Sequence, residues 1–363
     1  MRYKIKIVSI FIAVVFSFFL GSRWDTIASK IERRLTQKQE RSLFAVTEHK
    51  PFVIIIPSYN NSEWVEKNLR SVLEQKYDNY RVIYIDDASS DATYAQAKNL
   101  IKHYQKTHLV TLIHNDNNRG ALENTYRAVH SCEAYEIVVI CDGDDWLAHD
   151  RVLERLNETY ANPDVWLTYG SYVEYPNYSY TVANFSKELP RKIIDQQSVR
   201  AFSKKNWSLS HLRTFYAGVF QQIKLADFLY EGQYLDAAGD LAAMIPMVEM
   251  VGYHAQFINE ILYIYNRATP LNDHKLRAKR QQALADHILN AKPYERIASI
   301  EAMKEEGSVD LISFSFDPLR GKPRPKGRVC RAEDQGLKMD IQALYQYKNR
   351  SQHIEYDPTF IAR

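Results

Sequence analysis

Short apolar runs alternate with amphipathic segments through the first half of the chain, beginning after Pro51. The apolar runs are rich in Val and Ile, as strands buried on both faces of a sheet are. The amphipathic segments repeat their apolar positions every three or four residues, as helices do. The expected strands are 52–56, 80–85, 109–113 and 136–141, and the expected helices are 63–74, 91–105 and 120–131. This alternation predicts right-handed βαβ crossovers and a Rossmann-like α/β fold, with a mostly parallel sheet and flanking helices.

The pattern is less regular beyond Asp150. It predicts helices at 151–160, 240–250 and 275–289, strands at 165–172 and 257–265, and one further strand at 309–317. The basic run at 321–328 is rich in Gly and Pro, so no element is expected there. We therefore expect one α/β domain at 51–292 and a poorly defined tail. The expected divisions are a nucleotide-binding half at 51–150, a second half at 151–292 and the tail at 293–363.

The N-terminus carries a membrane-targeting pattern, in which basic residues precede an uncharged apolar run from Ile7 to Leu20. This run is shorter than the roughly 20 residues that span a bilayer, so it fits either a signal peptide or a short anchor. The bulky residues that follow lack a small-residue cleavage site, which favours an uncleaved single-pass anchor at 1–22, with 23–50 as a stalk or linker. The basic flank favours a translocated domain, and the side of the membrane on which the domain lies stays open.

Composition and charge narrow the class of protein. With 45% hydrophobic and 25% charged residues over 363 positions, the chain has the balance of a globular protein. Its 47 basic and 44 acidic residues give a net charge of +3, which provides no general basis for binding nucleic acid. The three cysteines form neither a disulfide framework nor a zinc spacing. Stability is therefore expected to come from packing.

The fourth expected strand runs directly into three carboxylates, Asp142, Asp144 and Asp145. Carboxylates at the carboxyl end of a buried strand lie where open α/β sheets bind ligands, and they repel one another unless a cation is present. With neither His nor Cys beside them they suit a hard divalent ion, and Mg²⁺ usually shares its shell with substrate phosphates. A calcium loop fits less well, because Trp146 and the Leu after it would stand where an oxygen ligand and a Gly are needed. The turn therefore predicts a metal-bound diphosphate.

Three other expected strands also end in polar segments, namely 57–60, 86–91 and 114–120. The carboxyl ends of parallel strands meet at one edge of a sheet, so the four polar segments together predict a binding site. None of them is a Gly-rich dinucleotide loop or contains a Walker lysine. Phosphate charge would have to be met by metal instead.

Taken in order from Pro51 to about Lys275, these motifs resemble the inverting GT-A glycosyltransferases of family 2. The resemblance implies a GT-A fold and a hexosyltransferase or related enzyme. Such an enzyme moves a sugar from a nucleotide-sugar donor, with UDP as the expected nucleotide, onto an acceptor hydroxyl with inversion. The implied cofactor is Mn²⁺ or Mg²⁺, and the implied acceptor is a carbohydrate, a lipid or a protein.

The resemblance assigns donor binding to the first two polar segments. The residues that would line the pocket for base and ribose are Pro57, Tyr59 and Asn60. Asp87 would accept a hydrogen bond from the nucleobase, with Asp86 beside it. An acidic turn followed by a helix N-cap is the alternative interpretation of this segment, and it fits Asp91 better than Asp87.

The third and fourth segments would meet the diphosphate. Arg119 would face it, although a surface ion pair explains this residue equally well, and Gly120 would permit a tight entry into the helix. The acidic turn resembles the D-x-D element, in which carboxylates hold the metal against the diphosphate and contact the ribose. The residues of that element here are Asp142, Gly143, Asp144 and Asp145. Trp146 would either lie under the sugar or pack in the core.

The resemblance also implies that 151–292 is the acceptor half and that a carboxylate near the start of a helix there is the catalytic base. Asp240 is the best match, although the family's acidic pair is replaced by Gly239–Asp240 in this chain. Asp236 is the alternative base. An acid that merely stabilises the helix N-terminus is the other interpretation of Asp240.

Two further positions complete the expected site. Arg213 would bind the diphosphate or a charged acceptor, while His211 beside it is expected to be a packing residue. Many proteins of this fold complete the metal shell with a His from the C-terminal side. His274 is the first choice for that ligand, and His254 is the alternative.

Other functions fit the sequence less well. A nucleotidyltransferase would place a Gly-rich, basic loop after the first strand, and 57–62 contains no Gly, Lys or Arg. A processive polysaccharide synthase would carry a Gln-x-x-Arg-Trp element and later membrane spans, which are lacking. A catalytically decayed sugar-nucleotide-binding protein stays open because of the altered acidic pair.

Overall fold

The computed structural model describes residues 45–178, 187–269 and 278–299. The chain separates into two compact units, Met1–Glu48 and His49–Arg363, and the elements below all belong to the second. Several predicted features lie outside the described residues: the membrane anchor at 1–22, the linker up to residue 44, His274, the strand at 309–317 and the tail from residue 300. Within the described ranges, no helix is both long and apolar enough to cross a membrane.

One mixed sheet organises the second unit, with the strand order β3-β2-β1-β4-β7-β6-β10-β5. Its strands are β1 (Phe52–Ser58), β2 (Tyr80–Asp86), β3 (Val110–His114), β4 (Ile137–Ile140), β5 (Trp146–Leu147), β6 (Leu167–Tyr175), β7 (Thr214–Tyr216) and β10 (Ala255–Asn266).

The strands β1 to β4 form the parallel half of this sheet. β1 lies between β2 and β4 and pairs in parallel with both, and β3 pairs in parallel with β2. Every residue of β1 and β4 is buried, which explains their continuous runs of Val and Ile. The predicted α/β fold with a mostly parallel sheet is therefore confirmed.

The second half of the sheet is mixed. β7 has three residues, all buried, and runs antiparallel between β4 and β6. β10 pairs in parallel with β6 and antiparallel with β5, which directly follows the acidic turn. The sequence did not predict β5 or β7, because two or three residues show no measurable periodicity. Both strands lie next to the acidic turn, so they bear on the candidate site.

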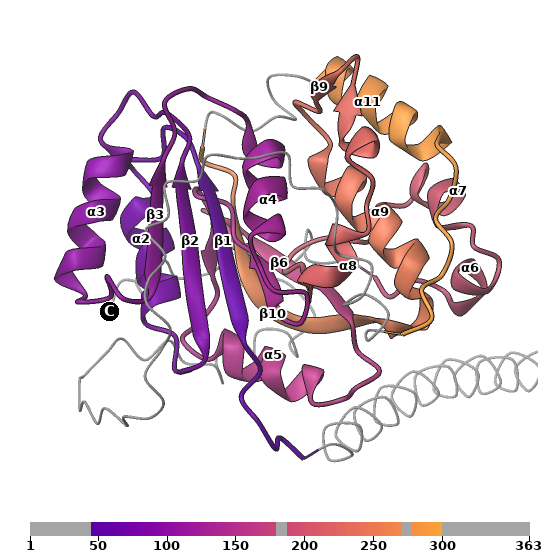
Figure 1. The fold of residues 1–363 in the computed structure, drawn as a ribbon, viewed down its shortest axis with the longest axis horizontal. Coiled ribbons are helices and arrows are strands. Elements are labelled where there is room, and N and C mark those ends of the chain that lie inside the picture. Colours follow the sequence, from indigo (N-terminus) through magenta and orange to yellow (C-terminus); the bar gives the residue numbers. More distant parts are fainter. Residues whose placement is uncertain (1–44, 179–186, 270–277, 300–363) are drawn as a thin grey trace, which may run out of the picture. The chain divides into compact units, whose positions relative to one another are not determined.

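Helices cover the sheet on both faces (Figure 1). α2 (Val65–Leu73) and α3 (Thr93–His103) pack side by side on one face, while α4 (Ala121–His130), α8 (Ala217–Gln221) and α9 (Gly239–Val251) lie on the other. The remaining helices of the described residues are α5 (Val152–Tyr160), α6 (Arg191–Asp195), α7 (Val199–Ser203) and α11 (Ala278–Asn290), with 3₁₀ turns η1 (Leu225–Phe228) and η2 (Gly252–His254).

α9 is the most deeply buried helix near the candidate site. Its residues from Met244 to Val251 are all buried, as expected of a helix enclosed on every side. The guanidinium of Arg200 in α7 forms two hydrogen bonds of 2.9 Å with Glu249 of α9, and its Nη1 donates to the carbonyl of Ile288 in α11. These contacts fix the position of α9 and hence of Asp240 in its first turn.

A two-stranded hairpin, β8 (Leu229–Tyr230) and β9 (Gln233–Tyr234), precedes α9. Its turn residues, Glu231 and Gly232, have φ angles of 53° and 78°, as a two-residue hairpin of type I′ requires. The sequence analysis did not identify this hairpin.

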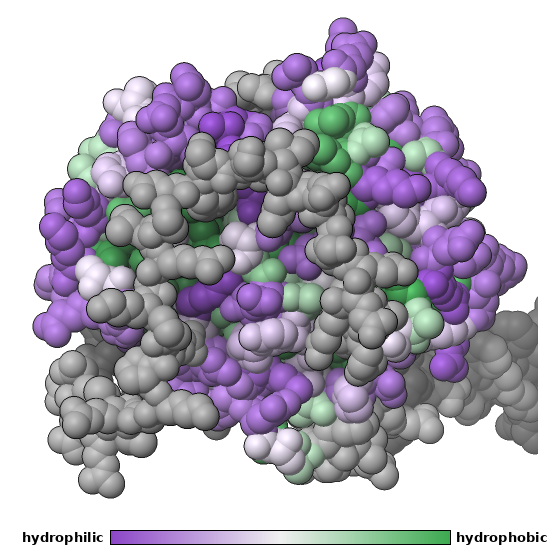
Figure 2. All heavy atoms as spheres, viewed as in Figure 1, coloured by the Kyte–Doolittle hydropathy of each residue, from purple (hydrophilic) through white to green (hydrophobic). Residues whose placement is uncertain are grey.

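The visible face of the described part is mainly hydrophilic, with apolar residues in small separate areas (Figure 2). Large apolar side chains that are exposed among the described residues are Val46, Tyr59, Tyr135, Leu225 and Tyr253. Scattered exposed apolar residues are normal for a globular protein. Of these five, Tyr59 is the one that the sequence assigned to a site.

Candidate active site

The segment after β1 is tied to the segment after β2 by hydrogen bonds between the two turns. The backbone N–H of Asn60 donates to Ser89 Oγ, and the Asn60 side-chain oxygen accepts from the Ser90 N–H, both at 2.9 Å. Asn60 has a φ of 51°, a left-handed conformation that Asn tolerates. Pro57 is buried and Tyr59 is 40% exposed. The Tyr59 ring is thus accessible where the sequence predicted a base and ribose pocket.

Asp91 stabilises the start of α3, as the alternative interpretation of this segment predicted. Its Oδ1 accepts from the Thr93 N–H at 2.9 Å, and its Oδ2 accepts from the Ser62 N–H at 3.0 Å. Burial raises the pKa of the Asp91 carboxyl, but the hydrogen bonds from Thr93 and Ser62 outweigh it, so the pKa is lowered overall. Asp91 is therefore part of the framework that joins the two segments.

Both carboxylate oxygens of Asp87 are bound by the loop that follows β3. Oδ1 accepts from the Arg119 N–H at 2.9 Å and from Asn115 Nδ2 at 2.8 Å, and Oδ2 accepts from the Gly120 N–H at 2.8 Å. Gly120 has a φ of 84° and directly precedes α4, so it permits the tight entry that was expected. Asp87 thus fixes this loop, and its contact with a nucleobase stays a prediction.

Asp86 is fully buried at the end of β2 and leaves one oxygen unused. Its Oδ2 accepts from His114 Nδ1 at 2.7 Å, and the Tyr94 ring lies 4.5 Å from the His114 ring. Its Oδ1 is buried and has no hydrogen-bond partner within the described ranges. Buried polar atoms normally have a partner, so Asp86 Oδ1 is a candidate acceptor for a bound ligand. The sequence analysis did not single out His114, which carries no motif of its own.

The acidic turn after β4 packs directly against the end of β1. A Cβ on Gly143 would lie 2.4 Å from Ser58 Oγ and 2.8 Å from Ser58 Cα, so the position requires Gly. Asn68 of α2 donates from Nδ2 to the carbonyls of Asp142 and Asp145, at 3.0 and 2.8 Å. The turn is therefore held from two sides. Asn68 is a supporting residue that the sequence gave no reason to choose.

Asp145 is fully buried and joins the turn to β10. Its Oδ2 accepts from the Tyr263 hydroxyl and its Oδ1 from the Asn266 N–H, both at 2.7 Å. Burial, followed by the charges of Asp144 and Asp142, raises the pKa of the Asp145 carboxyl well above its usual range. Asp145 supports the turn in this structure, and its role as a metal ligand stays a prediction.

Asp142 and Asp144 are partly exposed, unlike Asp145. Among the described residues, no three His, Cys, Asp or Glu side chains are grouped as a complete metal site. Two carboxylates nevertheless suit a hard divalent ion whose other ligands are water and phosphate oxygens. This donor set therefore fits Mg²⁺ or Mn²⁺ bound together with a diphosphate. The expected third ligand, His274, lies outside the described residues.

His254, the alternative third ligand, lies at the wrong end of β10. Its ring stacks on Trp166 at 3.7 Å, and its Nδ1 forms a hydrogen bond of 2.7 Å with the Asp164 carbonyl. It precedes the first residue of β10, whereas Asn266, the last, contacts the acidic turn. A strand of this length separates its two ends by more than 30 Å, about 3.3 Å per residue. The alternative assignment to His254 is therefore wrong.

Trp146 is a packed aromatic residue, which was one of the two predictions for it. It is 7% exposed, its ring stacks on Trp64 at 6.4 Å, and it meets the Tyr175 ring edge-on at 5.2 Å. The Lys67 ammonium lies 5.2 Å from the centre of the Trp146 ring. Trp146 therefore fixes the segment after the acidic turn, and its position under a sugar stays a prediction.

Arg213 connects the candidate base to the end of β4. Its carbonyl accepts from the Ile140 N–H at 3.3 Å, which places it beside the acidic turn. Its Nη1 lies 4.0 Å from Asp240 Oδ2, and its Nη2 donates to His211 Nε2 at 2.7 Å. Its Nε is buried and lacks a hydrogen-bond partner within the described ranges. This Nε is therefore a candidate donor to a bound ligand.

His211 is a packing residue, as expected. Its ring stacks on the Tyr263 ring at 4.5 Å, with the planes 5° apart. Burial, followed by the charge of Arg213, lowers the pKa of the His211 ring well below its usual value, so the ring is neutral and accepts from Arg213. Because the Tyr263 hydroxyl also binds Asp145, a continuous set of contacts runs from Asp240 to the acidic turn.

Asp240 lies in the first turn of α9, with its side chain 30% exposed. A Cβ on the preceding Gly239 would lie 3.3 Å from Leu122 Cδ1 of α4. This close packing of α4 against α9 favours Gly where the family shows an acid. Asp236, the alternative base, is exposed and pairs with Arg280 at 3.1 Å. The structure thus places Asp240, rather than Asp236, next to Arg213.

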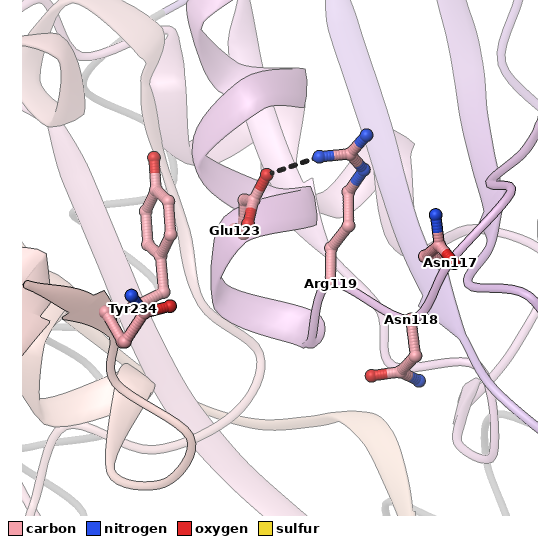
Figure 3. Close-up of a pocket in the computed structure, with 6 residues that line it drawn as sticks. Asn117, Asn118, Arg119, Glu123 and Tyr234 are labelled. Carbon is pink, nitrogen blue, oxygen red and sulfur yellow. Dashed lines mark hydrogen bonds and ion pairs between the residues drawn. The ribbon is translucent and has the colours of Figure 1, made fainter.

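The Arg119 side chain forms an ion pair with Glu123, at 3.0 Å, on the first turn of α4. Both residues line a pocket of about 300 Å³, shown in Figure 3, and the other lining residues are Asn117, Asn118, Gln233 and Tyr234. The surface ion pair expected for Arg119 is therefore present. Its contact with a diphosphate stays a prediction.

The fold and the site define a class of protein. A Rossmann-like sheet carries an acidic D-x-D turn after β4. Asp240, a carboxylate on α9, lies 4.0 Å from the guanidinium of Arg213, whose backbone lies beside that turn. Residues 53–223 match the family model described as Glycosyl transferase family 2. Over these residues the chain is similar to that family, as its motifs predicted. The matched segment includes the acidic turn and Arg213 but ends before Asp240.

Individual relatives resemble parts of the chain. A glycosyltransferase of Haemophilus influenzae is 29% identical over 119 residues, which are 33% of this chain and 46% of the relative. The poly-β-1,6-N-acetyl-D-glucosamine synthase of Staphylococcus epidermidis is 27% identical over 188 residues, 51% of this chain and 42% of the relative. The chain spans about half the length of the curated relatives it matches.

Among solved structures, a mannosyltransferase from Pyrobaculum calidifontis in complex with GDP-Man and Mn²⁺ is similar to this chain. The two are 20% identical with a TM-score of 0.45, and the match covers 74% of each chain.

Proposed function

We propose that the domain transfers a sugar from a nucleotide diphosphate, with UDP as the first choice, to an acceptor hydroxyl with inversion. The observation that carries this proposal concerns two of the four buried side-chain atoms that lack a partner among the described residues, Asp86 Oδ1 and Arg213 Nε. β2 and β7 flank β1 and β4 in the sheet, so these atoms stand on either side of the acidic turn. A nucleoside diphosphate would satisfy both.

The hydrogen-bonding chemistry of these two atoms suggests how the nucleotide-sugar donor is oriented in the site. We propose Asp86 in place of Asp87 as the acceptor for the ring N–H of uracil, because both oxygens of Asp87 already accept from the loop before α4. The guanidinium of Arg213 donates to phosphate oxygens. The base would therefore lie over β2, with Tyr59 and Asn60 beside it, and the diphosphate over the acidic turn. The sugar would then lie on the side of Arg213 and Asp240.

Asp142 and Asp144 would hold the divalent ion, which when bound supplies positive charge against the departing diphosphate. Asp240 would accept the proton of the attacking hydroxyl as the sugar is displaced. Arg213, held by His211, would orient the Asp240 carboxylate and bind phosphate oxygen with its free donor. A single displacement of this kind inverts the configuration of the sugar.

We propose further that residues 1–22 anchor the domain to a membrane, on the basis of their uncharged apolar run and basic flank. Full-length protein is expected to remain in the membrane fraction after alkaline carbonate extraction, and a chain that begins at residue 45 is expected to be released. Release of the full-length protein would contradict the anchor.

A metal test addresses the donor half of the proposal. Full-length protein with Mn²⁺ or Mg²⁺ is expected to release nucleoside diphosphate from at least one member of a nucleotide-sugar panel. EDTA should stop that release, and added Mn²⁺ should restore it. Equal release in EDTA would exclude the metal role of Asp142 and Asp144.

Asp240→Asn tests the base, because it removes proton acceptance while keeping the size of the side chain. Transfer should be lost, and binding of the donor, measured by calorimetry, should stay within about twofold of the wild type. Asp236→Asn is the matched control and should retain transfer. Transfer that survives in Asp240→Asn would place the base elsewhere.

A further inference from the structure

The pocket beside Arg119 lies between two elements that the sequence does not connect. Asn117, Asn118 and Arg119 come from the loop before α4, Glu123 comes from its first turn, and Gln233 and Tyr234 form β9. Its volume of about 300 Å³ is at the lower end of the range of small-molecule sites, about 300–1,000 Å³. In Figure 3 the Tyr234 ring and the Arg119 guanidinium lie on either side of Glu123.

The lining of this pocket suits a neutral, hydroxyl-rich ligand. Asn117, Asn118 and Gln233 supply amide donors and acceptors, and the ring of Tyr234 supplies a flat apolar face. The charges of the lining balance, because Arg119 pairs with Glu123 at 3.0 Å. A second cation, Arg127, also lies 3.3 Å from Glu123. The carboxylate between them would oppose a phosphate that approached Arg119.

Asp87 holds the backbone of the loop that lines this pocket. Its carboxylate binds the backbone N–H groups of Arg119 and Gly120. The loop backbone is therefore fixed on the side of Asp87, while the side chains at 117–119 line the pocket. The buried acceptor atom that we assign to the base, Asp86 Oδ1, does not line it.

The pocket is instead continuous with the elements that carry the candidate base. Leu122, next to Glu123 in α4, packs against Gly239, next to Asp240 in α9. Tyr234 begins the short segment that leads to Asp240, and the carbonyl of Phe228 accepts from the Leu235 N–H at 3.0 Å to hold that segment to η1. A ligand in the pocket would thus lie on the acceptor side of the site.

We propose that this pocket is an acceptor subsite that binds a sugar unit of a glycan chain, next to the unit that receives the transferred sugar. The amide groups and Glu123 would bind its hydroxyls, and the Tyr234 ring would stack on its apolar face. This inference rests on the proposed function, and it narrows the acceptor from a carbohydrate, lipid or protein to an oligosaccharide or polysaccharide.

Two variants of the hairpin test the subsite without touching the proposed donor site. Gln233→Ala removes an exposed amide, and Tyr234→Leu removes the ring while keeping an apolar side chain. Tyr234→Phe keeps the ring and tests whether stacking is what matters. Tyr135→Leu changes a tyrosine that is 51% exposed outside the pocket and serves as the control for a loss of tyrosine as such.

The binding experiment uses full-length protein and saturation-transfer NMR. The probes are glucose, maltose and maltotetraose, then N-acetylglucosamine with its β-1,4-linked dimer and tetramer, and pyrophosphate as an anionic probe. In at least one series the oligosaccharides should bind more tightly than the monosaccharide. Gln233→Ala and Tyr234→Leu should each weaken that binding by about fivefold, the effect of one ring or amide contact, while Tyr234→Phe and Tyr135→Leu should not.

Three outcomes would overturn the subsite: no saccharide binds, the hairpin variants bind saccharide as the wild type does, or the same variants lose pyrophosphate instead. A second measurement, metal-dependent release of nucleoside diphosphate in the absence of acceptor, distinguishes failure of the subsite from failure of the proposed function. If the wild type shows no release with any donor, the proposed function fails whether or not saccharides bind. If the wild type and the variants release equally and saccharide binding is unchanged, only the subsite fails.

Discussion

The guanidinium of Arg213 lies between Asp240 and His211, 4.0 Å from the carboxylate of the first and 2.7 Å from the ring of the second. His211 in turn stacks on Tyr263, whose hydroxyl binds Asp145 in the acidic turn. The candidate base is thus connected to the candidate metal site through three side chains. A change at Arg213 should therefore affect sugar transfer, because it disturbs both Asp240 and the contacts that lead to Asp145.

Replacing Arg213 tests this connection. Arg213→Met should lower kcat/KM for transfer by about a hundredfold, the size expected when one donor to developing charge is removed. Arg213→Lys keeps the charge but loses the planar fork, so its loss should be smaller. Arg191→Met is the control, because Arg191 is not a candidate site residue: its guanidinium lies 5.3 Å from the Tyr253 ring. Transfer at the wild-type rate in Arg213→Met would exclude a role for this guanidinium.

The parallel half of the fold could be predicted from the sequence because its strands are short apolar runs and its helices are long enough to show a period. β1 and β2 each have seven residues, and α2 to α4 have nine to eleven. Their boundaries differ from the expected ones by a few residues at most. In contrast, β7 has three residues and owes its place to burial between β4 and β6, a tertiary contact without a local pattern.

The candidate site divides in the same way. Asp142 and Asp144 follow a recognisable strand, so their place at the sheet edge could be expected, and Asp240 opens an apolar helix. The roles of Asp86 and Asp87 could not be separated in advance. The loop before α4 binds one of these two adjacent carboxylates and not the other. That loop lies about 30 residues further along the chain, so no local pattern shows which carboxylate it binds.

Gly143 offers a test of how closely the acidic turn must approach β1. A Cβ at this position would lie 2.4 Å from Ser58 Oγ and 2.8 Å from Ser58 Cα, and the backbone of β1 has no room to move inside the sheet. Gly143→Ala should therefore lower the free energy of unfolding by about 1–3 kcal/mol and should weaken metal-dependent donor binding. Urea unfolding and calorimetry with UDP and Mn²⁺ measure the two effects.

Gly239→Ala is the matched control for Gly143→Ala. Its Cβ would meet Leu122 Cδ1 at 3.3 Å, and the end of that side chain can move. Its effect on unfolding should be the smaller of the two. If both variants unfold alike, the contact with Ser58 does not determine the need for Gly143.

His149 should make the domain less stable in mild acid. Burial lowers the pKa of His149 to about 4, with the opposing charge of Asp150 and the like charge of Arg151 as smaller contributions. The unfolded chain therefore takes up the proton more readily than the folded one, so stability falls as the pH drops below about 6.5 and stops falling near the folded pKa. The loss attributable to His149 by pH 4 is on the order of 3 kcal/mol.

His149→Asn isolates this contribution, because the imidazole Nδ1 accepts from the Arg151 N–H at 3.2 Å and an Asn oxygen can accept the same bond. Urea unfolding from pH 7.5 to 4.5 should show a shallower decline in this variant than in the wild type. His108→Asn changes an exposed histidine and should leave the decline unchanged. Equal slopes in the wild type and His149→Asn would show that His149 is not the titrating group.

The buried pair of Arg200 and Glu249 should be more costly to break than to replace. Arg200 donates to both Glu249 oxygens at 2.9 Å and to the Ile288 carbonyl, and their side chains are 8% and 1% exposed. Arg200→Met leaves a buried carboxylate without its cation, so the free energy of unfolding should fall by about 3–5 kcal/mol. Arg200→Met combined with Glu249→Leu removes both charges and should recover most of that loss, as urea unfolding would show.

Arg151→Met is the control, because it breaks an exposed ion pair and should cost about 0–1 kcal/mol. Because α9 carries Asp240, Arg200→Met should also transfer sugar more slowly than the double variant, and equal stability of these two would mean that the carboxylate finds another partner.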